Sequence, residues 1–204
     1  MIDVHINTRK SDNKEYLQQC LESLNHDRVN VIMHPFDDRG VGYARLSALD
    51  KGNSDLFAFV DPDDYIEPGT FDRGLKILKN SNYSAYFTNH WVVKDNKLQR
   101  KWFHKLRVGG FTQETLMHHV VIFRKHVVEP VLPLLAGVKT SDIKLLNLQS
   151  ILHGEVYGEE YCGYYWRCDG GMNHTKYKPY VDNPVEWGNK VKQLRNEILE
   201  NRNP

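Results

Sequence analysis

The segment with the clearest capacity for chemistry runs from residue 59 to residue 68 and reads FVDPDDYIEP. In it, an apolar run ends in three closely spaced carboxylates, Asp61, Asp63 and Asp64. Clustered carboxylates repel one another unless a cation neutralises them. Mg²⁺ and Mn²⁺ favour oxygen ligands and typically bind one or two carboxylates together with substrate phosphates. The pattern therefore predicts a divalent metal holding a diphosphate, with a solvated Asx-Pro turn as the alternative.

The first 90 residues must supply the elements that position these carboxylates. Apolar runs and alternating patterns predict strands, and apolar residues at helical spacing predict the helices between them. Such an alternation predicts an α/β fold with a mostly parallel central sheet flanked by helices, in which ligands bind at the carboxyl ends of the strands. The expected strands are 2–8, 29–33, 56–60 and 85–88, and the expected helices are 13–25, 39–51 and 68–80.

The second half of the chain is less regular. We expect a hairpin within 90–108, a strand at 120–123, a helix at 141–152, an aromatic strand at 161–167 and a closing helix at 183–201. No internal repeat or linker separates these segments, so the 204 residues are expected to form a single domain.

The composition is that of an ordinary globular protein. Charged residues make up 26% of the chain, and the formal net charge is +1, which argues against a strongly basic nucleic-acid binder. No apolar run reaches the roughly 18 residues of a membrane span, and the N-terminus does not resemble a secretory signal. Three cysteines are too few for a disulfide scaffold and predict a reducing compartment, so we expect a cytoplasmic protein.

The segment from Gly40 to Leu78 resembles the nucleotide-sugar-binding half of GT-A glycosyltransferases, particularly family 2. That family shows a Gly-x-x-x-Ala-Arg helix start, an apolar strand, an Asp-x-Asp-Asp block and a later Pro. The matching residues here are Gly40, Ala44 and Arg45, then residues 59–64, then Pro68. The opening strand, with Asn7 and Thr8, resembles the first strand of the family, which touches the nucleotide.

Two later segments resemble the family as well. Ser141-Asp142 resembles a Glu-Asp pair at a helix start, in which the Asp is the catalytic base, with Ser141 where the Glu would be. Tyr164 to Arg167, followed by Gly170 to His174, resembles a Tyr-Tyr-Arg-x-His segment near the donor phosphates. The resemblance covers residues 1–175 and implies a nucleotide-sugar-binding half at 1–90, a catalytic and acceptor half at 91–182 and a C-terminal helix at 183–204.

The resemblance implies an inverting, metal-dependent glycosyl transfer from a nucleotide sugar, most simply a UDP-sugar, to an acceptor hydroxyl. Asp142 is then the candidate base, or otherwise a helix cap. Asp63, Asp64 and His174 are candidate ligands of Mn²⁺ or Mg²⁺, although His174 also fits a surface loop. The candidate donor-binding residues are Thr8, Asp38, Arg45, Asp61 and Arg167, of which Arg45 would pair with the carboxylates and Arg167 would clamp phosphate.

The chain departs from the family at the second strand. Family members have a strand ending in Asp-Asp-Gly-Ser, which reads the nucleobase, whereas this chain has only the strand 29–33 before Gly42. Either Asp37-Asp38-Arg39-Gly40 takes the place of that motif or the motif is missing.

Residues 91–107 form a basic segment in which six Lys and Arg residues are interleaved with Trp91, Trp102 and Phe103. Basic side chains beside aromatic rings can hold a phosphate backbone or stack on a base. The segment therefore leaves open an acceptor that is modified DNA or a polyanionic glycan, or contact with anionic lipid; the plain alternative is a solvated hairpin whose aromatic residues pack on the core.

Two other classes compete with the transferase. A nucleic-acid-binding protein whose carboxylates are only turn residues would bind DNA or RNA in a salt-sensitive way through the basic segment. A sugar nucleotidyltransferase would need a Gly-rich phosphate loop near the N-terminus, which the sequence IDVHINTRKSD lacks.

Overall fold

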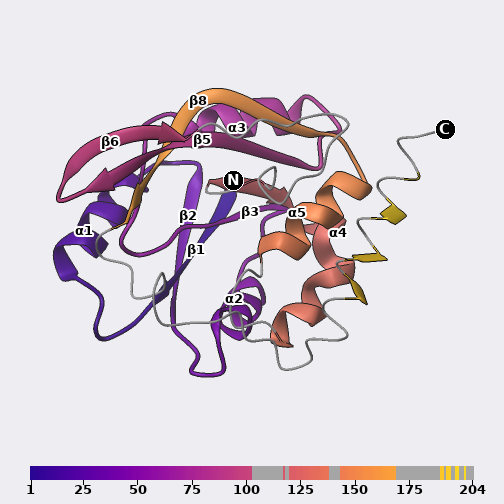
Figure 1. Ribbon diagram of the computed structural model, residues 1–204, viewed down its shortest axis with the longest axis horizontal. Helices are drawn as coiled ribbons and strands as arrows, with labels where there is room; N and C mark the ends of the chain where they lie inside the picture. The colour runs from indigo at the N-terminus through magenta and orange to yellow at the C-terminus, as the bar shows by residue number, and fades with distance from the viewer. Residues whose placement is uncertain are drawn as a thin grey trace.

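The computed structural model describes residues 1–102, 117, 120–137 and 143–168, and then 189–190, 192–193, 196–197 and 200. Strands and helices alternate through the first part of the chain and give way to a strand-rich second part (Figure 1). The elements are β1 (Ile2–Thr8), α1 (Lys14–Ser23), β2 (Val29–Pro35), α2 (Val41–Leu49), β3 (Leu56–Phe59), β4 (Tyr65–Ile66), α3 (Thr70–Lys79), β5 (Ala85–Lys94), β6 (Lys97–Trp102), β7 (Val121–Arg124), α4 (Lys125–Val128), the 3₁₀ helix η2 (Glu129–Gly137), α5 (Ile143–Leu152) and β8 (Val156–Arg167).

These strands form one eight-stranded sheet in the order β2-β1-β3-β7-β5-β8-β4, with β6 paired to β5 beside this path. The pairings show that β1, β2, β3, β5 and β8 run in one direction and that β4, β6 and β7 run against them. The prediction of an α/β fold with a mostly parallel central sheet is therefore confirmed. Helices flank the sheet, which curls across the molecule in Figure 1.

Each face of the sheet buries its own apolar core, because successive side chains of a strand point to opposite faces. Ile2, Val4 and Ile6 of β1 pack with residues of α1 and α3 on one face. On the other face, Phe57 and Phe59 of β3 pack with residues of α2, η2 and α5. The sheet is thus the middle layer of three.

Local features of the sequence explain several element ends. Asn13 caps α1, and its side chain accepts hydrogen bonds from the backbone N–H groups of Glu15 and Tyr16. Asp95 and Asn96 both adopt positive φ values, 50° and 56°, and form the tight turn that joins β5 to β6. Asp and Asn tolerate this left-handed conformation better than other residues with side chains do, so these two residues favour a hairpin turn at this position.

The remaining differences from prediction concern lengths and short elements. β5 runs from Ala85 to Lys94 and is longer than the expected strand at 85–88. The short strand β4 and the helices α4 and η2 were not predicted. Of the predicted closing helix, the described residues between 189 and 200 are helical, and the others lie outside the described part of the chain.

Candidate active site

The candidate site lies at the carboxyl ends of three neighbouring parallel strands. β1 pairs with β2 on one side and with β3 on the other, so these strands end at the same edge of the sheet, at Thr8, Pro35 and Phe59. Directly after β3, the segment Asp61 to Asp64 turns back, and the backbone N–H of Asp64 donates to the carbonyl of Asp61 at 3.1 Å. In the part of the chain that the structure describes, the three predicted carboxylates therefore come together in one turn, which we call the aspartate turn.

Asp64 fixes the aspartate turn to β8. It is 1% exposed, and both of its carboxylate oxygens accept hydrogen bonds from β8. Oδ2 accepts from the Tyr164 hydroxyl at 2.6 Å, and Oδ1 accepts from the Arg167 backbone N–H at 2.7 Å. Burial raises the pKa of Asp64 well above its usual value, and the charges of Asp63 and Asp61 add to the effect.

The Tyr164 hydroxyl connects two members of the turn. It accepts a hydrogen bond from the backbone N–H of Asp61 at 3.4 Å and donates its own proton to Asp64. On the other side, the Cys20 thiol of α1 donates to the Asp61 carbonyl at 3.6 Å. The turn is thus held from both β8 and α1, and the Asp61 side chain is left to face outward.

Asp61 is the open member of the turn, since 41% of its side chain is exposed. Its Oδ1 lies 3.2 Å from Nη2 of Arg45, whose side chain is only 7% exposed. The Arg45 guanidinium also lies over the Phe59 ring, 4.7 Å from the ring centroid. The ion pair expected between Arg45 and the carboxylates is present, and the Arg45 charge lies directly beside the open carboxylate.

The chemistry of this turn fits Mg²⁺ or Mn²⁺. Burial and the nearby Asp61 charge raise the pKa of Asp63 to about 6, so two partly accessible carboxylates lie in mutual repulsion that a cation would relieve. Asp64 is less suited to bind the cation, because it is buried and each of its oxygens already accepts a hydrogen bond from β8. Within the described ranges, no group of three or more His, Cys, Asp or Glu residues is arranged around a metal position. Further ligands would have to come from substrate phosphates, water or other parts of the chain.

Arg167 lies beneath the turn and supports it. The residue is 3% exposed, its Nη1 donates to the Asp63 carbonyl and its Nη2 donates to Gln19 of α1. The guanidinium is sandwiched between Tyr16 and Tyr65, 4.1 and 4.8 Å from the ring centroids. This arrangement ties β8, the aspartate turn and α1 together, with the guanidinium directed to the protein rather than to the solvent.

The other predicted donor-binding residues lie at the same edge of the sheet. Thr8 donates from its hydroxyl to the His34 carbonyl at 3.2 Å and so links the ends of β1 and β2. Asp38 is exposed in the loop before α2, whereas its neighbour Asp37 forms a close ion pair with Arg39. Thr8 and Asp38 thus border the region where a ligand at the aspartate turn would extend.

A row of buried polar side chains on β1 and β2 was missed by the sequence reading. His5 is 1% exposed, and neither of its ring nitrogens has a hydrogen-bond partner among the described residues; the same holds for Asn7 Oδ1 and His34 Nε2. Burial lowers the pKa of His5 to about 4 and also lowers that of His34. The alternation of polar residues at positions 3, 5 and 7 was the available signal, because alternate residues of a strand share a face.

Asp142 and His174, the predicted base and the predicted metal-binding histidine, lie outside the described residues. Their roles stay predictions.

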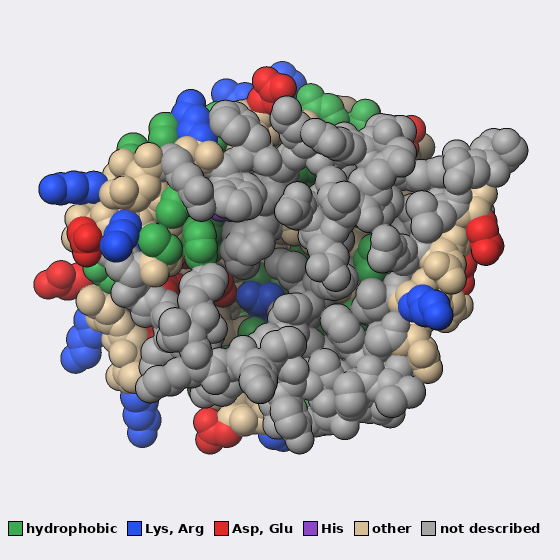
Figure 2. All heavy atoms as spheres, in the orientation of Figure 1, with side chains coloured by type: hydrophobic (Ala, Val, Ile, Leu, Met, Phe, Trp, Pro, Cys, Tyr) green, Lys and Arg blue, Asp and Glu red, His purple; other side chains and the backbone are tan. Residues whose placement is uncertain are grey.

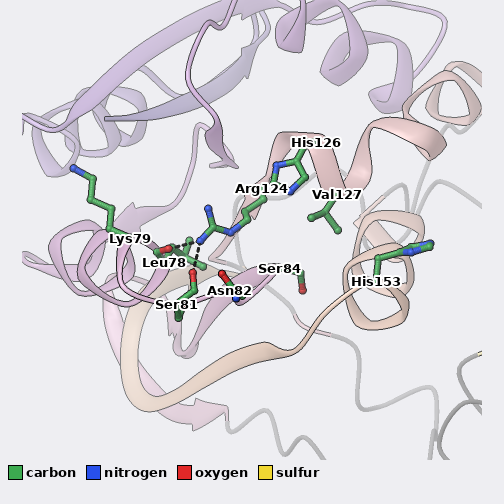
Figure 3. Close-up of a pocket in the computed structure, with 9 residues that line it drawn as sticks. All are labelled: Leu78, Lys79, Ser81, Asn82, Ser84, Arg124, His126, Val127 and His153. Atoms are coloured by element: carbon green, nitrogen blue, oxygen red, sulfur yellow. Dashed lines mark hydrogen bonds between the residues drawn. The ribbon is translucent and has the colours of Figure 1, made fainter.

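A separate cavity of about 580 Å³ lies at the opposite end of the sheet (Figure 3). In Figure 3, Arg124 sits in the middle of this cavity and bonds to the carbonyls of Leu78 and Ser81 at the end of α3, while Lys79 points away. Arg124 therefore serves as a cap for α3. The lining residues are Leu78, Lys79, Ser81, Asn82, Ser84, Arg124, His126, Val127 and His153.

Among the described residues, no helix has the length and apolar character needed to cross a membrane.

Comparison with known proteins identifies the family and the fold of this chain. The Glycosyl transferase family 2 model matches residues 6–128, which is more than half of the chain. No curated protein matches the chain. Among solved structures, S. aureus TarS 1–349 in complex with UDP-GlcNAc is similar at a TM-score of 0.69 and 16% identity, over 97% of this chain and 66% of that one. The same TarS fragment with UDP gives a TM-score of 0.62 at 14% identity, over 97% and 65% of the two chains.

These findings establish the GT-A fold, and the chain belongs to glycosyl transferase family 2. The chain spans slightly less than two thirds of the TarS fragment and 39% of the longer TarS structure, which it matches at a TM-score of 0.62 and 15% identity.

Proposed function

We propose that this protein is a glycosyltransferase that moves a sugar from a nucleotide-sugar donor to an acceptor hydroxyl. The observation that carries the proposal is the aspartate turn, which combines an open carboxylate at Asp61, a buried guanidinium beside it and a rigid attachment to β8. Its position at the carboxyl ends of parallel strands is where α/β sheets bind ligands. Membership of glycosyl transferase family 2 supports the same activity.

We infer that the donor is a UDP-sugar. The similar TarS structures contain UDP-GlcNAc and UDP. At 16% and 14% identity, these structures share their fold with this chain, and that shared fold is what supports the inference. In this chain, the ligand would lie along the ends of β1, β2 and β3, with Thr8 and Asp38 at its nucleoside end and the aspartate turn at its diphosphate end.

Asp61 and Asp63 would hold the divalent cation, which when bound supplies positive charge to the donor diphosphate. This assignment moves Asp64 from ligand to positioning residue, because its two oxygens already accept hydrogen bonds from β8. Arg167 takes a positioning role for the same reason, since its terminal nitrogens bond to Asp63 and Gln19.

In the proposed transfer, the acceptor oxygen bonds to the anomeric carbon of the donor sugar. The bond from that carbon to the phosphate oxygen breaks, and the nucleoside diphosphate leaves with the bonding electrons. The acceptor proton passes to the base, for which we propose Asp142, and the attack from the opposite side inverts the anomeric configuration. Arg45 orients Asp61 through their ion pair while negative charge develops on the leaving diphosphate.

Donor binding tests this proposal directly. We expect a UDP-sugar to raise the melting temperature in the presence of Mn²⁺ by more than GDP-, CMP- or dTDP-linked sugars do, because a ligand that binds only the folded state stabilises it by mass action. Asp63→Asn should remove most of the Mn²⁺-dependent shift. Asp50→Asn, an exposed carboxylate at the end of α2, should retain it and is the matched control. A protein that responds to no nucleotide sugar with or without Mn²⁺ would rule out the proposal.

A further inference from the structure

The cavity drawn in Figure 3 is a concave site that the proposed donor chemistry does not use. Arg124, at the end of β7, pairs with Leu56, the first residue of β3, whereas the aspartate turn follows Phe59 at the other end of that strand. The volume of about 580 Å³ lies within the range of about 300–1,000 Å³ that is usual for ligand pockets. The cavity can therefore hold a small molecule, and the length of β3 separates it from the donor site.

Arg124 offers unused hydrogen-bond donors to this cavity. Its Nε donates to the Tyr83 carbonyl at 2.7 Å, and its Nη2 donates to the carbonyls of Leu78 and Ser81. Among the described residues, nothing accepts from Nη1, and in Figure 3 this nitrogen points away from the carbonyls that hold the other one. A guanidinium has five N–H groups, so the two on Nη1 remain for a ligand. The three carbonyls hold them in a fixed position.

Two further polar side chains flank Arg124 in the cavity lining. Asn82 and His126 are exposed, and neither side chain makes a hydrogen bond to a described residue. In the view of Figure 3 they lie on opposite sides of Arg124, whereas Lys79 and His153 point away from it. An amide and an imidazole can each donate an N–H, the imidazole in either charge state. The cavity thus presents three donor groups from three separate side chains.

The cavity carries a positive charge that no described carboxylate neutralises. Its described lining contains no Asp or Glu, and none of the ion pairs among the described residues includes Arg124. Elsewhere the two signs are mixed, since Figure 2 shows Lys, Arg, Asp and Glu side chains interspersed along the left margin of the molecule, where Figure 1 places α1. The cavity therefore favours an anionic ligand.

The arrangement of the donors favours phosphate among small anions. Arg grips a planar carboxylate through two parallel N–H groups of its fork, and here the carbonyls already occupy Nε and Nη2. A ligand must therefore collect hydrogen bonds from several side chains that approach from different directions. A phosphate group presents three terminal oxygens in a tetrahedral arrangement, so it can accept from Arg124, Asn82 and His126 together.

We propose that this cavity binds the phosphate group of a small phosphorylated molecule. Nη1 of Arg124 lies at the centre of the site, with Asn82 and His126 at its sides. The rest of the ligand would lie against the apolar side chains of Leu78 and Val127, which also line the cavity. The inference goes beyond the proposed glycosyl transfer and does not depend on it.

Isothermal titration calorimetry with inorganic phosphate and with glycerol 3-phosphate tests the proposal. Constant ionic strength and EDTA keep general salt effects and metal-bound phosphate at the aspartate turn out of the measurement. Both probes should bind saturably at one site. Arg124 is left intact because it caps α3; instead, His126→Glu places a carboxylate beside Nη1 and should weaken binding at least about tenfold, since like charges in contact cost several kcal/mol.

Lys76→Gln is the matched control, because it lowers the net charge by the same one unit at an exposed position of α3 outside the cavity. It should bind both probes as the wild type does, and so should Asp63→Asn at the donor site. Thermal melting without phosphate checks that each variant is folded.

Four outcomes would overturn the site: no saturable binding of inorganic phosphate, wild-type affinity in His126→Glu, failure of glycerol 3-phosphate to bind, or succinate binding as tightly as phosphate. Loss of binding in Asp63→Asn would also overturn it, by placing the phosphate at the aspartate turn. The UDP-sugar thermal shift is measured in parallel and should be unchanged in His126→Glu. A donor shift without phosphate binding leaves the proposed function standing and removes this site, and phosphate binding without a donor shift does the reverse.

Discussion

Asp64 is the buried carboxylate that attaches the aspartate turn to β8. Its burial would be costly for a charged group unless both oxygens found partners, and β8 supplies them from Tyr164 and Arg167. The consequence is that Asp61 and Asp63 project from a turn whose backbone is already fixed. At the residue scale, preorganisation of the turn is therefore the main contribution of β8.

Replacing Tyr164 with Phe tests this role. The change keeps the buried ring but removes the donor to Asp64 and the acceptor for the Asp61 backbone N–H. An unsatisfied buried polar group costs roughly 1–3 kcal/mol, so we expect a loss of stability of that size together with weaker donor binding. Denaturant unfolding and a donor titration would measure both effects. Tyr157→Phe, whose ring packs against Tyr83 at the same face, is the control, and equal behaviour of the two variants would refute the role of Tyr164.

The sequence alone predicted that these carboxylates gather at the end of a strand but not what holds them in place. The Asp cluster after an apolar strand predicted the position of the carboxylates, and Arg45 was expected to pair with them, as it does with Asp61. The bonds from Asp64 to β8 cross 100 and 103 residues, and no local pattern encodes such contacts. Tyr164 and Arg167 were therefore recognisable as site residues but not as the groups that lock the turn.

The elements around the site are packed closely enough to constrain side chains at specific positions. Gly74 in α3 is such a position, since a Cβ there would lie 3.0 Å from the Tyr86 ring and too close to Ile122. The helix can approach β5 and β7 closely only because this residue has no side chain. Because α3 begins soon after the aspartate turn, this packing also fixes the path of the chain as it leaves the turn.

Gly74→Ala should destabilise the protein even though Ala is the better helix former. The gain in helix propensity is about 1 kcal/mol, whereas overpacking a close contact costs about 1–3 kcal/mol. We expect a net loss of about 1 kcal/mol in denaturant unfolding. Lys76→Ala, at an exposed position of the same helix, should leave stability within about 0.5 kcal/mol of the wild type. A Gly74→Ala protein as stable as the Lys76→Ala protein would show that the contact relaxes freely.

Element prediction succeeded where the pattern was local. The helices α1, α2 and α3 and the strands β1, β2 and β3 follow from apolar periodicity and were predicted within a few residues. β8 begins at Val156 rather than at 161, because Gly158, Glu159 and Glu160 obscure the strand signal. Gly158 is needed there, since a Cβ would collide with the Phe87 ring across the strand pair. Pro130 and Pro133 argued against a helix at residues 129–137, so η2 was not predicted. This short 3₁₀ helix accommodates both prolines.

At the scale of the whole molecule, one sheet joins the aspartate turn to the β5–β6 hairpin. β7 lies between β3 and β5, and β8 lies between β5 and β4, so strands from the second half of the sequence are inserted among those of the first. The aspartate turn and the hairpin are therefore parts of one framework. The buried polar row of β1 and β2 lies in the same sheet.

His5 should make the protein less stable as the pH falls from about 6.5 to about 4. Burial lowers the folded-state pKa of His5 from 6.5 to about 4, so within this window the unfolded chain binds the proton and the folded chain does not. The expected loss is at most about 3 kcal/mol, at 1.36 kcal/mol per pH unit. Urea unfolding at pH 4.5 and 7 would measure it. His5→Phe, which suits the neighbouring Phe57 and Phe59 rings, should reduce the pH dependence, and His126→Gln at an exposed position should not. An unchanged pH dependence in His5→Phe would contradict this assignment.

We propose that the aspartate turn activates a nucleotide-sugar donor, which can be measured as nucleotide release from a UDP-sugar in the presence of Mn²⁺. We expect the wild type to release UDP. Asp61→Asn and Asp63→Asn should each lower the rate at least about tenfold through lost charge stabilisation of the leaving diphosphate, whereas Asp50→Asn should not. Release at the wild-type rate by both Asp61→Asn and Asp63→Asn, with the fold intact, would contradict this role of the turn.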